Sequence, residues 1–163
     1  MRLKPNTLIV VAGPTASGKT ALAIQIAKAV DGEIVSADSM QIYRGVDIAT
    51  AKPTPEELAA VPHHLIGFLP MDRAFSVADY AELARKEIND ILSRGKVPVL
   101  CGGTGLYIKA IVDNVQYSEA ITGDEALRER LRQLAEREGN DALWRRLEAM
   151  DPETAKRIHP NNV

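Results

Sequence analysis

Over the first two thirds of the chain, short apolar runs alternate with longer segments in which apolar residues recur every three or four positions. The short runs have the length of strands, and the longer segments have the period of helices. Such alternation is typical of a parallel sheet with helices packed on it, so we predict an α/β fold with a doubly wound parallel sheet. The predicted strands are Leu8–Ala12, Glu33–Ala37, His64–Phe68 and Val97–Cys101, and the predicted helices are Thr20–Val30, Val77–Arg94 and Leu106–Val112.

Local signals support two of these boundaries and single out one long connection. Ser76 is a suitable N-cap for the helix that follows it, and Gly95 is a suitable residue to end that helix. The stretch Met40–Pro62 contains three prolines and is predicted to be irregular. Because it follows the second strand, this connection lies on the carboxyl side of the sheet, where ligand-binding loops occur.

The pattern changes after Tyr117. Apolar residues then recur at helical spacing among eight basic and nine acidic residues between Asp124 and Arg157, which predicts a helical appendage or insertion domain. The apolar stripes have no evident partner, so we expect the chain to be incomplete. The predicted organisation is an α/β core over residues 1–116 and the start of a helical region over 117–163. The stripe residues are Leu127, Leu131, Leu134, Leu143, Leu147 and Met150, and Trp144 beside them is predicted to be core.

Composition narrows the class without naming a function. The chain has 163 residues, 20 basic and 22 acidic side chains and a formal net charge of −2, so no global basic field indicates nucleic acid. A single cysteine, Cys101, excludes an internal disulfide framework. It closes an apolar strand and is predicted to be buried. With neither a secretory leader nor a long apolar span in view, we expect a cytoplasmic protein without a membrane anchor and without a stable protein partner.

The most informative segment is the octet that follows the first predicted strand. Its two glycines, its lysine and its threonine match the spacing of a phosphate-binding loop, or P-loop, whose backbone N–H groups surround phosphate oxygens. The next helix adds the partial positive charge of its N-terminus, and the threonine hydroxyl is placed to bind Mg²⁺. The predicted phosphate-binding residues are Gly13, Pro14, Thr15, Ala16, Ser17, Gly18, Lys19 and Thr20, of which Thr20 is the metal ligand.

A second candidate group follows the second predicted strand. Asp38 stands at the carboxyl end of that strand, which in a doubly wound sheet faces the same crevice as the phosphate-binding loop. Its carboxylate could bind Mg²⁺, act as a general base toward an acceptor, or cap a helix. Lys52, farther along the irregular connection, could reach a phosphate or lie in solvent. His63, His64 and His159 lack companions at metal-ligand spacing, so no zinc site is predicted.

Four blocks in order and in register resemble the tRNA dimethylallyltransferase, or tRNA isopentenyltransferase, family. The resemblance covers essentially the whole chain, although the family usually has glycine where this chain has Ala49. If that position needed a positive φ, alanine would strain the turn by roughly 1 kcal/mol. The blocks are Gly-Pro-Thr-Ala-Ser-Gly-Lys-Thr at 13–20, Asp-Ser-Met-Gln-Ile-Tyr at 38–43, Asp-Ile-Ala-Thr-Ala-Lys-Pro at 47–53 and Gly-Gly-Thr-Gly-Leu-Tyr at 102–107.

The resemblance implies an enzyme that moves a five-carbon dimethylallyl group from dimethylallyl diphosphate to N6 of an adenosine next to the anticodon of tRNA. Pyrophosphate leaves, stabilised by the loop, by Lys19 and by Mg²⁺ on Thr20, and Asp38 is the catalytic base that takes the N6 proton. Because the family continues beyond the last residue here, we expect this chain to retain diphosphate binding while lacking transfer activity. The tRNA-binding residues implied by the resemblance are Asp38, Ser39, Met40, Gln41, Thr104 and Arg128.

Other functions remain open at this point. An adenylate prenyltransferase would use the same donor with AMP or ATP as the acceptor. A P-loop kinase for small molecules would place ATP in the loop and use Asp38 to activate a hydroxyl. A nucleotide-binding module without chemistry of its own is the third alternative.

Overall fold

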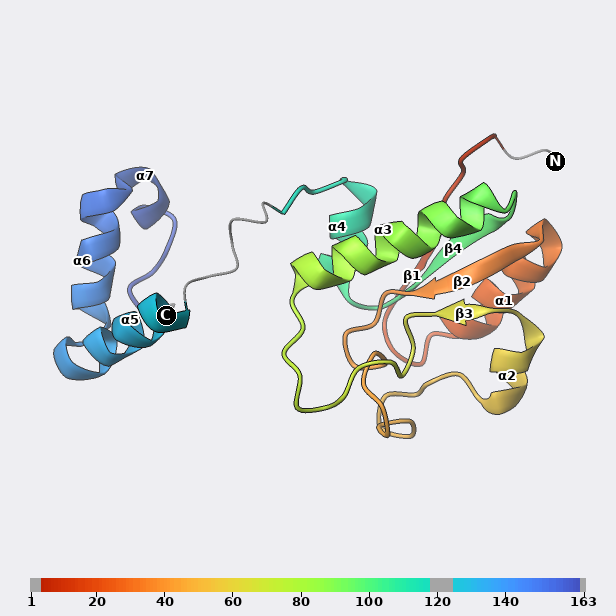
Figure 1. Ribbon diagram of the computed structural model, residues 1–163, viewed down its shortest axis with the longest axis horizontal. Helices are drawn as coiled ribbons and strands as arrows, with labels where there is room; N and C mark the ends of the chain where they lie inside the picture. The colour runs from red at the N-terminus through yellow and green to blue at the C-terminus, as the bar shows by residue number, and fades with distance from the viewer. Residues whose placement is uncertain (1–3, 118–124, 162–163) are drawn as a thin grey trace. The chain divides into compact units, whose positions relative to one another are not determined.

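A computed structural model describes residues 4–117 and 125–161, and the chain forms two compact units, Met1–Gln116 and Tyr117–Val163 (Figure 1). The first unit holds a four-stranded parallel sheet in the order β1-β4-β2-β3. All strands are parallel, so their carboxyl ends lie along one edge, and β4 separates β1 from β2. The strands are β1 (Ile9–Ala12), β2 (Gly32–Ser36), β3 (His63–His64) and β4 (Val97–Gly102).

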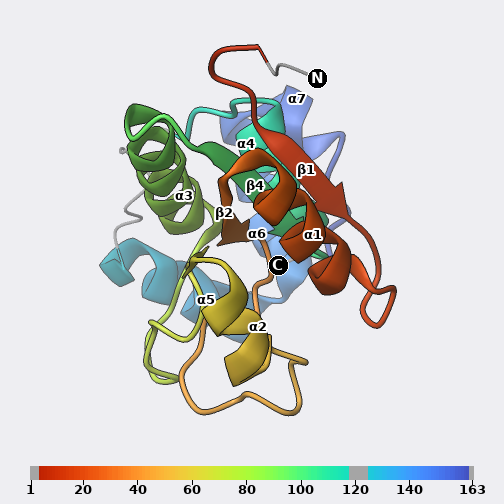
Figure 2. The same ribbon diagram turned by 90° about the vertical axis from the view of Figure 1, so that its right-hand side faces the viewer.

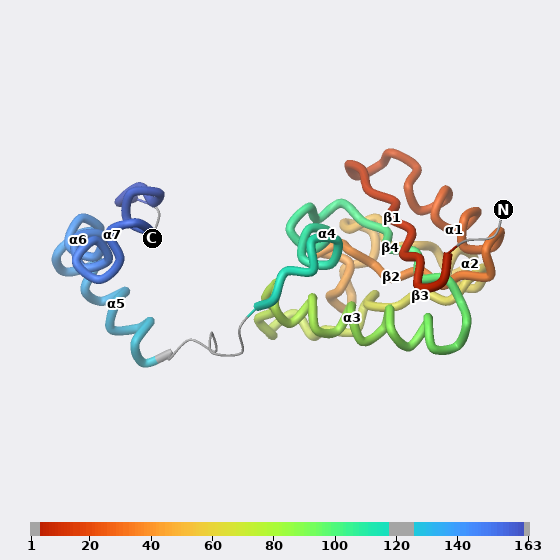
Figure 3. Tube along the Cα trace, turned by 90° about the horizontal axis from the view of Figure 1, so that it is seen from above, coloured from red at the N-terminus to blue at the C-terminus, as the bar shows by residue number. Residues whose placement is uncertain are grey.

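Helices cover both faces of this sheet (Figures 2 and 3). Successive side chains of a strand point to opposite faces, so Val99 and Cys101 of β4 pack with one helix layer and Leu100 packs with the other. The first layer is centred on α1, and the second on α3 and α4, which confirms the doubly wound α/β fold. The helices of this unit are α1 (Lys19–Val30), α2 (Pro55–Ala60), α3 (Val77–Ser93) and α4 (Gly105–Val112).

The predicted caps of α3 are confirmed and explain its limits. The Ser76 hydroxyl accepts a hydrogen bond from the Asp79 N–H at 3.2 Å, and the Asp79 carboxylate accepts one from the Ser76 N–H at 2.8 Å. This reciprocal pair satisfies two N–H groups that the helix itself cannot. After the last turn, Gly95 adopts φ +75°, which ends the helix.

Two predictions for the connection between β2 and α3 were wrong. The third strand is His63–His64 and not His64–Phe68, because Leu65 and Gly67 both adopt positive φ and interrupt the extended chain. The region predicted to be irregular contains the short helix α2. Its N-cap, Thr54, forms a capping box with Glu57, a signal that was legible in the sequence.

The remaining boundaries shift by at most one residue. The first two strands begin at Ile9 and Gly32, and β4 extends to Gly102. Helix α1 begins at Lys19, so the P-loop lysine is already the first helical residue.

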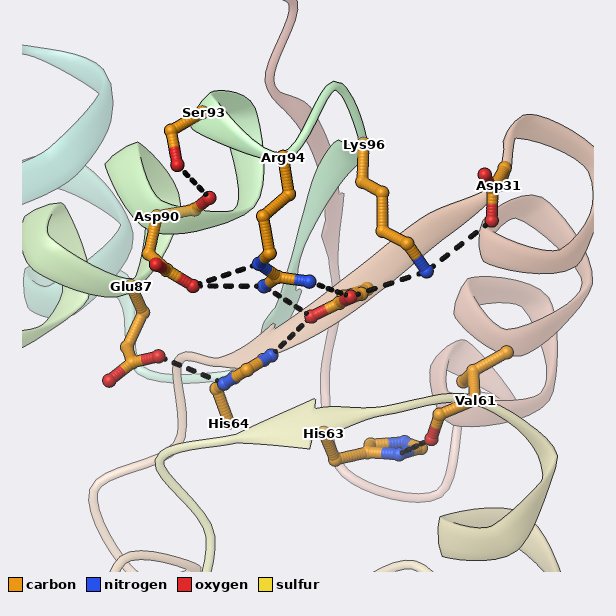
Figure 4. A network of polar contacts seen from close by, with 10 residues as sticks. Asp31, Val61, His63, His64, Glu87, Asp90, Ser93, Arg94 and Lys96 are labelled. Atoms are coloured by element: carbon orange, nitrogen blue, oxygen red, sulfur yellow. Dashed lines mark hydrogen bonds and ion pairs between the residues drawn. The ribbon is translucent and has the colours of Figure 1, made fainter.

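A network of ion pairs joins β2, β3 and the end of α3 away from the carboxyl edge of the sheet (Figure 4). Its centre is Glu33, which is buried and accepts hydrogen bonds from Arg94 at 2.5 and 2.9 Å and from His64 at 2.7 Å. Lys96 lies 3.4 Å from the same carboxylate. Hydrogen bonding to Arg94 is the main reason that the pKa of Glu33 is lowered to about 2, against the opposing effect of burial.

The two histidines of β3 therefore differ in their surroundings. His64 bridges Glu33 and, at 2.9 Å, Glu87. The Nδ1 atom of His63 lies 2.8 Å from the Val61 carbonyl oxygen, and its Nε2 atom is buried without a hydrogen-bond partner among the described residues. Burial lowers the pKa of His63, so the neutral ring is favoured.

The second unit consists of α5 (Glu125–Glu138), α6 (Asn140–Met150) and α7 (Pro152–Ala155). Trp144 is half-buried and donates from Nε1 to the Ile158 carbonyl oxygen at 2.8 Å, so it is less enclosed than the predicted core position. Among the described residues of this unit only Ala155 is buried. Five of the six residues of the predicted stripes, all except Leu134, face a hollow of about 440 Å³ in this unit, together with Trp144 and Ile158.

None of the helices within residues 4–117 and 125–161 combines the length and the apolar composition that a membrane crossing requires.

Candidate phosphate and acceptor site

The phosphate-binding loop leaves the carboxyl end of β1 and turns into α1. Its backbone reverses through left-handed conformations at Ala16 (φ +62°) and Gly18 (φ +79°). At Gly13 a side chain would be crowded, because a Cβ there would lie 3.1 Å from the Ser17 hydroxyl oxygen. The loop thus brings the N-terminus of a 12-residue helix to the edge of the sheet, where the free N–H groups of the first turn favour an anion.

Lys19 and Thr20 lie at the start of that helix and line a hollow of about 240 Å³. The Lys19 ammonium donates to the Pro14 carbonyl oxygen of its own loop at 3.0 Å, so it folds back over the loop. Of the eight predicted loop residues, Thr15, Ala16, Gly18, Lys19 and Thr20 line the hollow, whereas Gly13, Pro14 and Ser17 shape the turn behind it.

Asp38 lines the same hollow as Lys19 and Thr20. Its Oδ1 atom accepts hydrogen bonds from the Met40 N–H at 3.0 Å and from the Gln41 N–H at 3.3 Å. The carboxylate therefore caps a turn, and no helix follows it. Oδ2 accepts no hydrogen bond from the described residues, so one oxygen holds the turn while the other is left for a ligand. The Asp38 carboxylate can therefore cap the turn and bind a ligand in the hollow at the same time.

Thr104 joins the turn after β2 to the loop after β4. Its hydroxyl accepts a hydrogen bond from the Ser39 N–H at 2.9 Å and donates one to the Ser39 hydroxyl oxygen at 3.2 Å. Its own N–H donates to the Ala37 carbonyl oxygen at 3.1 Å. Two of the residues that the sequence associates with the acceptor are thereby held together, although 65 positions separate them along the chain.

The paired glycines before Thr104 are required by close approaches of the backbone. A Cβ on Gly102 would lie 2.2 Å from the Ala37 carbonyl oxygen, so any side chain at this position would clash with the backbone. A Cβ on Gly103 would lie 3.2 Å from the Gly13 carbonyl oxygen. Because β4 lies between β1 and β2, this glycine pair touches both the phosphate-binding loop and the Asp38 turn, and it brings the two to one site.

Gln41 also lines the hollow, but its amide is engaged within the protein. Its Nε2 group donates to the carbonyl oxygens of Thr50 and Ala51, each at 3.1 Å. Ala21, Thr50, Ala51 and Glu57 complete the wall of the hollow, and no role was predicted for them from the sequence. Thr50 and Ala51 belong to the sequence block at 47–53, and the long connection following β2 was expected to lie at the carboxyl edge.

The remaining candidates lie outside the hollow. Met40 has an exposed side chain, and Arg128 is an exposed residue of α5 in the second unit. Lys52 is neither at a phosphate position nor in solvent, because its side chain is only 7% exposed and ion-paired with Asp47. Cys101 is buried as predicted, and burial raises the pKa of its thiol to about 11, which makes it a poor nucleophile.

The hollow is chemically suited to a divalent cation that arrives with a diphosphate. In the part of the chain that the structure describes, no group of three or more His, Cys, Asp or Glu side chains is placed to hold a metal ion. The hydroxyl of Thr20 and the carboxylate of Asp38 are oxygen ligands in one hollow. Mg²⁺ commonly takes one or two such ligands and completes its shell with substrate phosphates and water.

The fold and the site together define a P-loop α/β protein in which a carboxylate faces the phosphate-binding loop. The family model described as IPP transferase matches residues 41–163, and the chain belongs to this family. The resemblance inferred from the four sequence blocks is thereby confirmed. A tRNA dimethylallyltransferase of Exiguobacterium sp. is 54% identical over 161 residues, which are 99% of this chain and 51% of that protein.

Solved structures agree with this assignment. The full-length tRNA isopentenylpyrophosphate transferase of Bacillus halodurans is 45% identical, with a TM-score of 0.68 over 96% of this chain and 52% of that one. A eukaryotic dimethylallyltransferase acting on tRNA is 30% identical, with a TM-score of 0.82 over 95% of this chain and 38% of that one. The chain spans about half the length of the curated relatives that it matches.

Proposed function

We propose that this protein transfers a dimethylallyl group from dimethylallyl diphosphate to N6 of an adenosine next to the anticodon in tRNA, releasing pyrophosphate. The observation that carries the proposal is that the Asp38 carboxylate lines the same hollow as Lys19 and Thr20. A base and a diphosphate site in one hollow are what such a transfer requires. The proposal is supported by relatives that are named tRNA dimethylallyltransferases.

The diphosphate side of the hollow stabilises the leaving group. As the C–O bond of the donor breaks, negative charge builds on the diphosphate and positive character develops on the allylic carbon. The Lys19 ammonium and the N-terminus of α1 lie where they oppose that negative charge. Mg²⁺, held by Thr20 and the diphosphate, would supply further charge neutralisation.

The acceptor side is served by Asp38. The lone pair of the adenine N6 amine is delocalised into the ring, so the amine is a weak nucleophile until its proton is removed. As the new C–N bond forms, the N6 proton passes to the carboxylate. The two backbone N–H groups on Oδ1 hold the carboxylate in place. Ser39, Met40, Gln41, Thr104 and Arg128 are proposed to contact the tRNA.

Asp38→Asn separates the two roles of this side chain. The amide oxygen can still accept the two N–H groups of the turn, so the fold and the binding of Mg²⁺ with dimethylallyl diphosphate should be preserved. Transfer to tRNA should fall on the order of 10²- to 10⁴-fold, the usual contribution of a positioned base. Calorimetric titration measures binding, and mass analysis of tRNA nucleosides measures transfer. Lys19→Met is the matched control and should weaken donor binding.

The proposed diphosphate site can be tested separately from group transfer, because donor binding does not require transfer of the dimethylallyl group. No binding of Mg²⁺ and dimethylallyl diphosphate by the folded chain would contradict the diphosphate site. Prenylation of AMP in preference to tRNA would favour an adenylate prenyltransferase. Phosphate transfer from ATP without prenyl transfer would favour a kinase.

A further inference from the structure

We propose that Lys52 is a positioning residue that holds the wall of the phosphate hollow opposite the P-loop by closing the loop Tyr43–Lys52. The inference deepens the proposed function and rests on it, because the wall in question encloses the proposed diphosphate site. Lys52 itself does not line the hollow. It acts through Thr50 and Ala51, which do.

The surroundings of Lys52 are unusual for a lysine. Its ammonium donates to the Tyr43 carbonyl oxygen at 2.5 Å and to Asp47 Oδ1 at 2.6 Å. The Lys52 side chain is only 7% exposed, whereas that of Asp47 is 70% exposed. Lysine is rarely buried unless it is paired, and an exposed partner contributes little to a pair by itself. The bond to the Tyr43 carbonyl is therefore the inner anchor, and it joins the first residue of the loop to the last.

The same loop is held at a second point by Gln41. Its amide donates to the carbonyl oxygens of Thr50 and Ala51, the two residues that precede Lys52. Ala51 adopts φ +48°, a left-handed conformation that is unfavourable for a residue with a Cβ. Such conformations persist only where the surroundings impose them. The Gln41 bond to the Ala51 carbonyl oxygen and the Lys52 bond to the Tyr43 carbonyl oxygen hold this turn, together with the backbone bond from the Ala51 N–H to the Ile48 carbonyl oxygen at 3.2 Å.

The consequence for the site is that its wall is already ordered before a ligand binds. A loop that must be ordered on binding lowers affinity by the conformational free energy of its residues. If Lys52 only stabilised the fold, its loss would lower the free energy of unfolding and leave the affinity of the folded molecules unchanged. A positioning role predicts a loss of affinity in molecules that are still folded.

The test compares three variants of this chain. Lys52→Met keeps the apolar stem and removes the donors, Asp47→Asn keeps the Oδ1 acceptor and removes the charge, and Lys86→Met alters an exposed lysine of α3. Titration with Mg²⁺ and dimethylallyl diphosphate should show affinity about 10-fold weaker for Lys52→Met, equivalent to about 1.4 kcal/mol. The other two should match the unaltered chain. Urea unfolding run in parallel shows that the variants are folded.

Hydrogen exchange in the absence of ligand supplies a readout that does not depend on the proposed function. Amides of residues 44–51 should exchange faster in Lys52→Met, while those of α3 should not change. If Lys52→Met does not fold, Lys52→Leu, which also removes the donors, takes its place. Unchanged exchange in this loop, or donor affinity equal to that of the unaltered chain, would overturn the inference. No donor binding by the unaltered chain, with faster loop exchange in the variant, would count against the proposed function and leave the role of Lys52 in the loop intact.

Discussion

At the scale of single residues, backbone conformation distinguishes alanines that look alike in the sequence. The strain expected at Ala49, where the family usually has glycine, is absent, because Ala49 is not among the residues with positive φ. The residue with positive φ in that turn is Ala51. The absence of the family glycine therefore pointed to the turn that contains a positive φ but to the wrong residue in it. The backbone conformation of Ala51 depends on how Gln41 and Lys52 hold the loop.

This difference predicts opposite responses to glycine. At Ala51 the relief of left-handed strain, about 1 kcal/mol, should offset the extra entropy that glycine adds to the unfolded chain, so Ala51→Gly should leave the free energy of unfolding nearly unchanged. At Ala49 there is no strain to relieve, and glycine should lower that free energy by roughly 0.5–1 kcal/mol. Urea unfolding of both variants measures the difference. A larger loss at Ala51 than at Ala49 would show that the conformation of the turn is different.

At the scale of elements, the Glu33 network fastens three of them at the end of the sheet remote from the site. The carboxylate comes from β2, His64 from β3, and Arg94 directly follows α3. Removing one member would leave a buried charge without a partner. The resulting loss in the free energy of unfolding is larger than the net stabilisation that the intact pair contributes. Contacts over long sequence separations join these helices and strands. Glu33 and His64 are 31 positions apart, and Glu33 and Arg94 are 61 positions apart.

The lowered pKa of Glu33 makes the stability of the protein depend on pH in acid. With a pKa of about 2 in the folded protein and 4.5 as the ordinary value, the unfolded chain binds the proton more tightly. The stabilisation is thus complete above about pH 5 and is lost as the pH falls toward 2. It amounts to on the order of 3 kcal/mol.

Urea unfolding between pH 6 and pH 3 should accordingly show a decreasing free energy of unfolding. Glu33→Gln should be less stable at pH 6 and should show a shallower decrease toward pH 3. Glu82→Gln, at an exposed position of α3, is the matched control and should follow the unaltered chain. Parallel slopes for Glu33→Gln and the unaltered chain would assign the acid sensitivity to other groups.

At the scale of the whole molecule, the two compact units divide the proposed work. Every residue that lines the phosphate hollow belongs to the unit Met1–Gln116. No described residue of the helical unit lines that hollow, and its proposed contact with tRNA is Arg128, whereas the other proposed tRNA contacts belong to the first unit. Binding of the diphosphate is therefore separable in principle from the part of RNA recognition that the helical unit supplies.

Deleting residues 117–163 tests this division. A chain of residues 1–116 should bind Mg²⁺ and dimethylallyl diphosphate as the unaltered chain does, because its hollow is complete, and it should bind tRNA more weakly, because Arg128 is removed. Calorimetry measures the first property and filter binding the second. Circular dichroism of the shortened chain verifies that it is folded. A folded shortened chain without donor binding would show that the helical unit takes part in the diphosphate site.

Features that arise from neighbours along the chain could be predicted from the order of residues. The phosphate-binding loop, the caps of α3 and the alternation of strands and helices depend on residues within a few positions of one another, so periodicity and spacing reveal them. Asp38 was placed at the correct edge because all the strands were expected to be parallel.

Contacts between segments that are distant along the chain became known from the tertiary structure alone. The shortness of β3, the engagement of the Gln41 amide, the burial of Lys52 and the ion pairs of Glu33 depend on which backbone groups and charges come to lie beside them. No local sequence pattern indicates which carbonyl oxygen or carboxylate becomes the hydrogen-bond partner of a distant side chain after folding. The physical reason is that burial and hydrogen bonding are properties of position in space, which the order of residues specifies only through the complete fold.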